Sequence, residues 1–146
     1  MQVYLLTHLI TTQDREFKDQ VESCEYSVPQ FDHRAHLRLA YVYLVQQNDA
    51  QAAVSLMKVA LINLLKHAGI EPSTKYHETL TEAWIFAVHH FLSHTESSTS
   101  ADDFIEQHPV MLDSKIMLSH YTEEVLFSEV ARRSFVEPNL DPIPRH

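Results

Sequence analysis

The sequence predicts a single all-α domain, because glycine is nearly absent and apolar residues recur with a helical period. Glycine occurs once in 146 residues, at Gly69, whereas an average protein contains about 7% glycine. A β-barrel or β-sandwich needs many tight turns, and glycine is a usual residue of such turns. Three segments instead repeat apolar side chains at the helical period of 3.6 residues. With 45% hydrophobic residues, the chain can bury the core of one compact, bundle-like helical domain over residues 1–146.

The N-terminal part of the chain is the least defined region of this prediction. Residues 1–30 begin with a short apolar run and continue with the charged segment DREFKDQVESCEY, which is compatible with a helix in a region that Pro29 ends. The first well-defined helix spans residues 31–47, with Asp32 near its N-terminus. An aspartate at that position accepts hydrogen bonds from backbone N–H groups that have no partner inside the helix.

Two further long helices are delimited by capping residues. A second helix is capped by Asp49 and stopped by Gly69, because a glycine ends a helix by adopting a left-handed conformation. A third helix is capped by Ser73 or Thr74 and runs to about His94. These three helices carry the clearest 3.6-residue periodicity.

In the C-terminal third the sequence predicts shorter helices. A short helix forms around Phe104 and is closed by Pro109, and Asp113 and Thr122 cap two further helical pieces that end near positions 119 and 135. Residues 137–146 contain three prolines and are expected to be an extended tail, since proline cannot continue a helix. The total is five to seven helices.

Composition and charge exclude several classes of protein. A single glycine cannot build a P-loop or a dinucleotide-binding fingerprint. The net charge of −9 argues against a nucleic-acid partner, which requires a basic face. No stretch approaches the roughly 20 apolar residues of a membrane helix. One cysteine permits no internal disulfide, and the first residues lack the basic region of a signal peptide. We therefore expect a cytoplasmic protein with no nucleic-acid or membrane partner.

Histidine is the unusual residue of this sequence, with 11 copies. Placing His36 at zero on a helical wheel puts His33 at about 60° and Ala40 at about 40°. Arg34 and Arg38 fall at about 160° and 200°, on the opposite side. Both histidines are therefore expected on the apolar face, three residues apart, where side chains are neighbours and can share one ligand.

The third helix is expected to contribute another inward histidine. With Leu80 at zero, Trp84 lies at about 40° and His77 at about 60°, while Glu78 lies at the edge of the apolar arc at about 160°. Buried imidazole needs a partner for each nitrogen, and neutral histidine is the commonest transition-metal ligand. We therefore interpret His77 as the third ligand of a metal site shared with the two histidines of the first helix.

The metal site has one alternative. A single histidine on an apolar face is more often a core residue bonded to a carbonyl oxygen, so the same three histidines could form a polar core. The order HETLT is not a zincin motif, because Thr81 stands where a second histidine is needed,. The roles of His8 and His120 are left open. The other histidines are interpreted as surface residues: His67, His89, His90, His94, His108 and His146.

The last helical region carries a separate pattern. Tyr121, Val125, Ser128 and Arg132 are spaced to share one face of a helix,. An arginine with a tyrosine could hold a carboxylate or another anion near the metal. The alternative is that Arg132 forms a surface ion pair with Glu129 or Glu124, or holds the proline-rich tail in place, neither of which needs a function.

Three sequence blocks resemble a known family. FDHRAHLRLAYVYL, KYHETLTEAW and HYTEEVLFSEVARRSFVEPNL are similar, in this order, to motifs of a family of small, mostly bacterial, uncharacterised proteins. The resemblance covers about residues 31–140 and supplies motifs rather than a reaction. His120 and Asn139 depart from the family's tyrosine and aspartate. The resemblance points to these residues: His33, His36, His77, Glu78, Thr79, Tyr121, Ser128 and Arg132.

The sequence thus predicts a small metal-dependent enzyme with a mononuclear site. His33, His36 and His77 would hold one divalent transition metal (iron, zinc or copper), and Glu78 would act as fourth ligand or general base. Tyr121 and Arg132 would orient a small polar or anionic substrate. The alternative is a non-catalytic domain that senses a metal or ligand, or binds a protein, through the same histidines. The sequence is compatible with a homo-oligomer.

Overall fold

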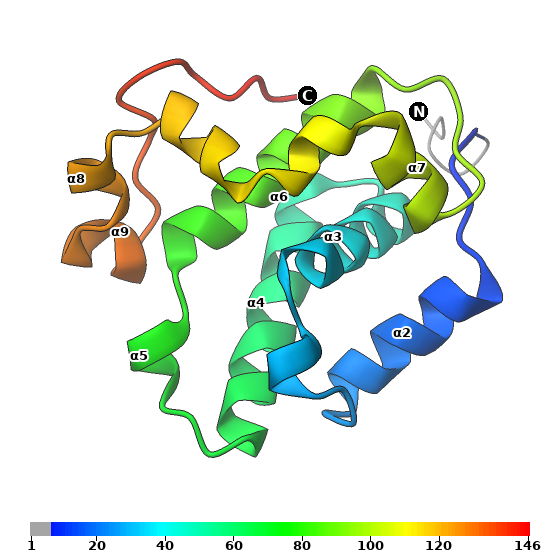
Figure 1. The fold of residues 1–146 in the computed structure, drawn as a ribbon, viewed down its shortest axis with the longest axis horizontal. Coiled ribbons are helices and arrows are strands. Elements are labelled where there is room, and N and C mark those ends of the chain that lie inside the picture. Colours follow the sequence, from blue (N-terminus) through cyan, green and yellow to red (C-terminus); the bar gives the residue numbers. More distant parts are fainter. Residues whose placement is uncertain (1–6) are drawn as a thin grey trace.

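The computed structural model describes residues 7–146, and these residues are all-α, as predicted (Figure 1). Within them the one β feature is an isolated bridge between His8 and Ser98. The apolar start of the sequence, residues 1–6, lies outside the described residues. None of the helices of the described chain is both long and apolar enough to cross a lipid bilayer.

Eight α-helices and three 3-10 helices (η) lie between Thr12 and Arg133 of the described chain, more than the five to seven helices expected. In chain order they are α2 (Thr12–Glu22), η1 (Val28–Gln30), α3 (His33–Gln47), α4 (Ala50–His67), α5 (Pro72–Lys75), α6 (Glu78–Ser93), α7 (Ala101–Gln107), η2 (Pro109–Leu112), η3 (Ser114–Ser119), α8 (Glu123–Leu126) and α9 (Glu129–Arg133).

Side-chain caps begin the central helices where the sequence predicts them. Asp32 accepts a hydrogen bond from the Ala35 N–H at 2.9 Å and begins α3. Asp49 accepts one from the Ala52 N–H at 3.0 Å and begins α4. Between them Asn48 adopts a left-handed conformation with φ of 51°, which asparagine tolerates better than most residues. Each of these bonds satisfies a backbone donor that has no partner inside its helix.

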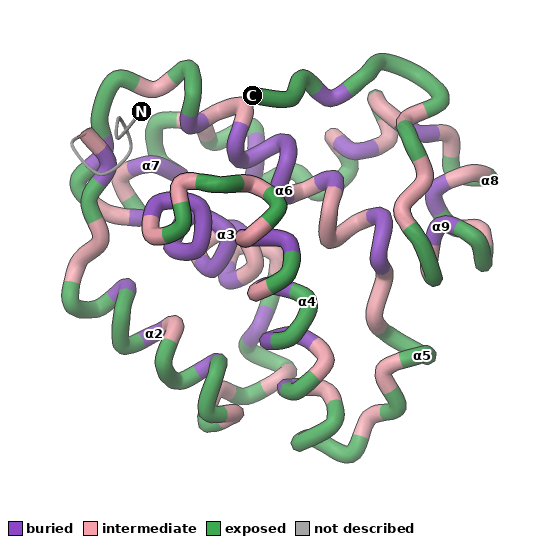
Figure 2. Tube along the Cα trace, turned by 180° about the vertical axis from the view of Figure 1, so that it is seen from behind, coloured by how far each residue is buried: buried purple, intermediate pink, exposed green. Residues whose placement is uncertain are grey.

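The core lies around α3, which contacts α2, α4, α6 and α7. Figure 2 shows that most of α3 is buried, and nine of its fifteen residues are. A second apolar cluster joins the outer side of α6 to the C-terminal third through Phe86, Met117, Tyr121 and Leu126. Helix α6 therefore contributes to both clusters. It begins at two candidate residues, with His77 as its N-cap and Glu78 as its first residue.

Two expected helices are interrupted in the structure. The helix expected from residue 73 or 74 is a single turn, α5, followed by Tyr76 in an extended conformation with ψ of 138°. The helix expected from Thr122 to about residue 135 is divided into α8 and α9, because Ser128 is extended and its hydroxyl caps α9 through the Ala131 N–H.

The C-terminal tail is extended, as predicted, and it lies against the folded domain. No residue from 134 onward belongs to a helix. Ile143 is buried in the second cluster, and the Arg145 guanidinium lies 4.0 Å from the centre of the Phe86 ring. The tail is thereby held beside α6.

Candidate functional site

A cavity of about 570 Å³ lies between α3, α4 and α6 and is completed by the start of η3 and the end of α8. This volume is within the range of about 300–1,000 Å³ that is common for small-molecule sites. Most of the wall is apolar. The residues that line it are Val28, Phe31, Asp32, His33, His36, Leu37, Ala40, Met57, Leu61, Leu64, Leu65, Lys75, Tyr76, His77, Leu80, Thr81, Trp84, Ile85, Ser114, Lys115, Leu118, Leu126 and Phe127.

The charged groups of the cavity wall are two lysines and one aspartate. Lys75 and Lys115 are exposed, and within residues 7–146 neither ammonium group has a hydrogen-bond or ion-pair partner. Asp32 is already used as the cap of α3. Neither lysine can be identified as a site residue from the sequence, because nothing in the local sequence indicates that η3 and α5 meet at one cavity.

His33 and His36 line the cavity, and each is bonded to a backbone carbonyl oxygen. His33 Nε2 lies 2.8 Å from the Met111 oxygen, and His36 Nδ1 lies 2.9 Å from the Asp32 oxygen. A carbonyl oxygen only accepts, so these nitrogens carry the protons and the opposite nitrogens, Nδ1 of His33 and Nε2 of His36, are acceptors. Burial lowers the pKa of His36, which favours its neutral form,.

His77 also lines the cavity, but both of its ring nitrogens are used within the protein. It is the N-cap of α6, where Nδ1 accepts the Leu80 N–H at 3.1 Å. Its Nε2 donates to the Leu126 carbonyl oxygen at 2.7 Å. Burial lowers the pKa of His77, and the positive charge of Arg132 lowers it further. The wheel that placed His77 on a helical face assumed a helix through residue 77, whereas α6 begins one residue later.

The three histidines therefore share a cavity without forming a ready ligand set. In the described part of the chain, one group of three histidine, cysteine or acidic side chains has ligand atoms within 4.8 Å of one another, and it consists of other histidines. Metal binding by His33, His36 and His77 stays a prediction. It would require His77 to give up either the hydrogen bond from the Leu80 N–H, which caps α6, or the hydrogen bond to the Leu126 carbonyl oxygen at the end of α8.

Glu78 lies outside the cavity wall and faces two partners. Lys58 Nζ lies 3.0 Å from a Glu78 carboxylate oxygen, and the Tyr76 hydroxyl donates to the same oxygen at 3.1 Å. Burial opposes ionisation of Glu78, but hydrogen bonds from Glu82 and Lys58 lower its pKa. Burial and the neighbouring Glu78 raise the pKa of Glu82 to about 7. The two carboxyl groups thus share a proton near neutral pH.

Tyr121 and Arg132 also lie away from the cavity wall. The Tyr121 hydroxyl is buried and donates to the Val136 carbonyl oxygen at 2.6 Å. Arg132 donates to the Thr74 carbonyl oxygen at 3.1 Å. Because the chain is not helical at Ser128, the four residues from 121 to 132 do not share one continuous helix face. In this structure both side chains hold neighbouring segments together.

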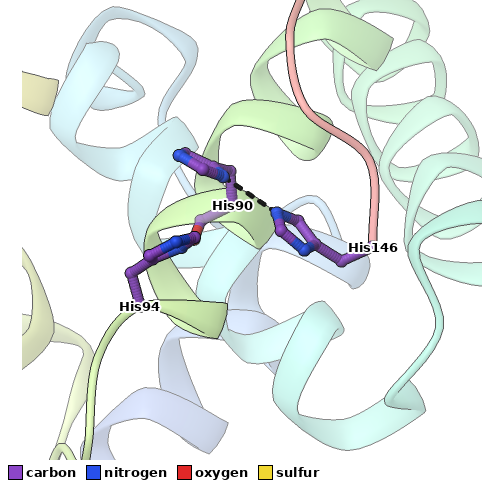
Figure 3. A group of neighbouring side chains, drawn as sticks. All are labelled: His90, His94 and His146. Atoms are coloured by element: carbon purple, nitrogen blue, oxygen red, sulfur yellow. Dashed lines mark hydrogen bonds between the residues drawn. The ribbon is translucent and has the colours of Figure 1, made fainter.

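The histidines that do converge lie at the surface, as the sequence predicts: His94 and His146 are exposed and His90 is half-buried. The surface prediction is wrong for His89, which is buried in α6. His90, His94 and His146 place one ligand atom each within 4.8 Å of the others. Figure 3 shows the three side chains and the hydrogen bond between His90 and His146. The spacing H-x-x-x-H at residues 90 and 94 is a sequence signal for two ligands on one helix face. No local pattern could add His146, which reaches α6 only through the tail.

Comparison with known proteins adds no relative to this description. No family model matches the chain, and no curated protein or solved structure matches it significantly.

Proposed function

We propose that this protein binds a small amphipathic carboxylic acid in the cavity between α3, α4 and α6. The observation that carries the proposal is an apolar cavity with Lys75 and Lys115 on its wall, both without a partner among the described residues. This is the non-catalytic, ligand-binding alternative that the sequence left open.

The apolar wall determines the body of the ligand. Leucines from α3, α4 and α6, together with Met57 and Trp84, surround the cavity. Transfer of a methylene group from water to such a wall is worth about 0.8 kcal/mol. A chain of about ten carbons fits a volume of this class, and its transfer supplies most of the binding free energy.

The lysines determine the head group. The wall carries two ammonium groups and one carboxylate, and that carboxylate, Asp32, accepts a backbone hydrogen bond. The local charge is therefore positive in a chain whose net charge is −9. A carboxylate head would pair with Lys75 and Lys115. The acceptor nitrogens of His33 and His36 would accept a hydrogen bond from a hydroxyl group of the ligand.

Trp84 provides a direct test, because it is the single tryptophan of the chain and lines the cavity. Its fluorescence is followed during titration with decanoate, decanol and decylamine, three probes that share a ten-carbon chain and differ in head-group charge. We expect decanoate to bind most tightly and decylamine most weakly. Equal affinity for all three would contradict a carboxylate-specific site, and no change with any probe would contradict binding itself.

A matched pair of variants tests the head-group contact. The double variant Lys75→Ala, Lys115→Ala is expected to bind decanoate about tenfold more weakly and decanol unchanged, since each partly exposed ion pair is worth up to about 1 kcal/mol. Lys66→Ala is the control, because Lys66 is exposed on α4 and is not part of the wall. A similar loss in Lys66→Ala would assign the effect to overall charge.

A second candidate is the metal-dependent enzyme that the sequence predicts. The supporting observation is that His33 and His36 each donate one N–H to a carbonyl oxygen, the support that ligating histidines usually have. The test is elemental analysis of untagged protein. His33→Ala and His36→Ala would each lose stoichiometric metal if this candidate holds, and Glu78→Gln would keep the metal but lose turnover if Glu78 is the base. Unchanged metal content in both histidine variants would reject it.

A further inference from the structure

We propose that His90, His94 and His146 form a site for one divalent transition-metal ion, zinc or copper(II), separate from the cavity. The site joins the C-terminal end of α6 to the last residue of the tail (Figure 3). It involves none of the residues of the proposed acid-binding site.

Two of the ligands come from consecutive turns at the end of α6. His90 lies in its last turn and His94 is its C-cap. At this spacing of four residues the side chains lie on one face, and their ring centres are 4.4 Å apart. The helix therefore already places the two imidazoles side by side, which reduces the ordering that metal binding requires.

The third ligand is positioned by tertiary contacts of the tail. Ile143 is buried, and Arg145 stacks on Phe86 of α6. These anchors bring His146 Nε2 to 2.8 Å from His90 Nδ1, with 5.7 Å between the ring centres of His94 and His146. A segment that would otherwise contribute a distant imidazole is thus held next to the pair on the helix.

The geometry needs only a small adjustment to become tetrahedral. Zinc–nitrogen bonds of about 2.0–2.1 Å place neighbouring ligand nitrogens about 3.3 Å apart. In the structure one nitrogen of the His90–His146 pair donates a hydrogen bond to the other. On metal binding that proton moves to the second nitrogen of its own ring, and the two nitrogens separate by about 0.5 Å. His94 and His146 are exposed, so a water molecule can complete the coordination.

The site and the cavity lie on different faces of α6. Ile85 is the last residue of α6 on the cavity wall. His90 lies five residues later, about 7.5 Å along the helix and about 140° around it, on the other side of α6. A metal bound at the tail therefore does not contact a ligand in the cavity. Failure of either proposal leaves the other standing, because the two use different residues and different probes.

The decisive experiment is calorimetric titration of untagged protein with Zn²⁺ in competition with a chelator. We expect one strong site per chain. His90→Ala, His94→Ala and His146→Ala should each weaken zinc binding by more than tenfold, since loss of a ligand exceeds the 10- to 100-fold effect of losing a supporting hydrogen bond. His67→Ala is the matched control, because His67 is an exposed histidine near the end of another helix, α4.

Spectroscopy with Cu²⁺ identifies the ligands independently of affinity. Electron paramagnetic resonance of the copper-loaded protein should show coupling to three imidazole nitrogens, and His146→Ala should reduce the number to two. Hydrogen exchange of residues 137–146 should slow when zinc is added to the wild type and remain unchanged in His146→Ala. The proposal is overturned if His146→Ala binds zinc as tightly as the wild type, or if His67→Ala loses as much affinity as the three ligand variants.

Discussion

The Nε2–H group of His77 donates to the carbonyl oxygen of Leu126, 49 residues away in the sequence, across 2.7 Å. The other ring nitrogen of His77 accepts the Leu80 N–H and caps α6. One imidazole thus ties the beginning of α6 to the end of α8. The contact also closes part of the cavity wall, to which both residues belong.

Removal of the His77 imidazole is expected to destabilise the fold. His77→Ala loses an N-cap, worth about 1 kcal/mol, and leaves the Leu126 carbonyl oxygen without its donor, which costs about 1 kcal/mol more. His77→Asn keeps a capping side chain and should lose about half as much. Urea denaturation followed by circular dichroism measures both differences. An effect of His77→Ala within about 0.5 kcal/mol of the wild type, the range of a surface substitution, would contradict the structural role.

The Glu78–Glu82 pair is expected to make stability depend on pH. The pKa of Glu82 is raised from 4.5 to about 7, so its stabilising contribution is complete below pH 4.5 and is lost as the pH rises through about 7. Glu82→Gln keeps a neutral hydrogen-bonding side chain at every pH. Its urea midpoint should therefore exceed that of the wild type at pH 8 and match it at pH 5.

The control for this prediction is Glu124→Gln, which neutralises an exposed carboxylate on α8. It should shift the midpoint little at either pH. A Glu82→Gln variant that is no more stable than the wild type at pH 8 would show that the two carboxyl groups do not share a proton.

Filling the cavity from α3 is expected to stabilise the protein and block the ligand. Ala40 lines the cavity and is buried, so Ala40→Leu adds three carbons inside it, a gain of the order of 1–2 kcal/mol. The melting temperature should rise and the affinity for decanoate should fall. Ala53→Leu is the control, because Ala53 is buried in α4 outside the cavity, where overpacking costs about 1–3 kcal/mol. A lower melting temperature in both variants would indicate that the cavity has no room.

The helices were predictable where a local side chain sets their boundaries. Asp32 and Asp49 begin α3 and α4 through hydrogen bonds to residues three positions later, so the sequence alone contains both partners. Gly69 follows the end of α4 with φ of 76°, as expected for a residue that stops a helix. Apolar periodicity then indicates which face is buried.

The candidate site was less predictable, because its contacts join distant segments. The bond partners of His33 and His77, Met111 and Leu126, are 78 and 49 residues away, and backbone carbonyls leave no signature in a sequence. The position of His146 depends on tail contacts that no local pattern encodes. The three histidines line one cavity. The wheel could not show that one nitrogen of His33, one of His36 and both of His77 are bonded within the protein.

The single glycine also affects the chain before it folds. An average composition would give about ten glycines in a chain of this length, and each glycine replaced by another residue at a compatible position stabilises a protein by about 0.4–1 kcal/mol through the unfolded state. Left-handed backbone occurs at Gly69 and, without glycine, at Asn48 and Cys24. The helix ends are set mainly by capping side chains, so the chain needs few glycines. Because it contains few glycines, its unfolded ensemble is less diverse, and folding loses several kcal/mol less conformational entropy than it would for an average chain.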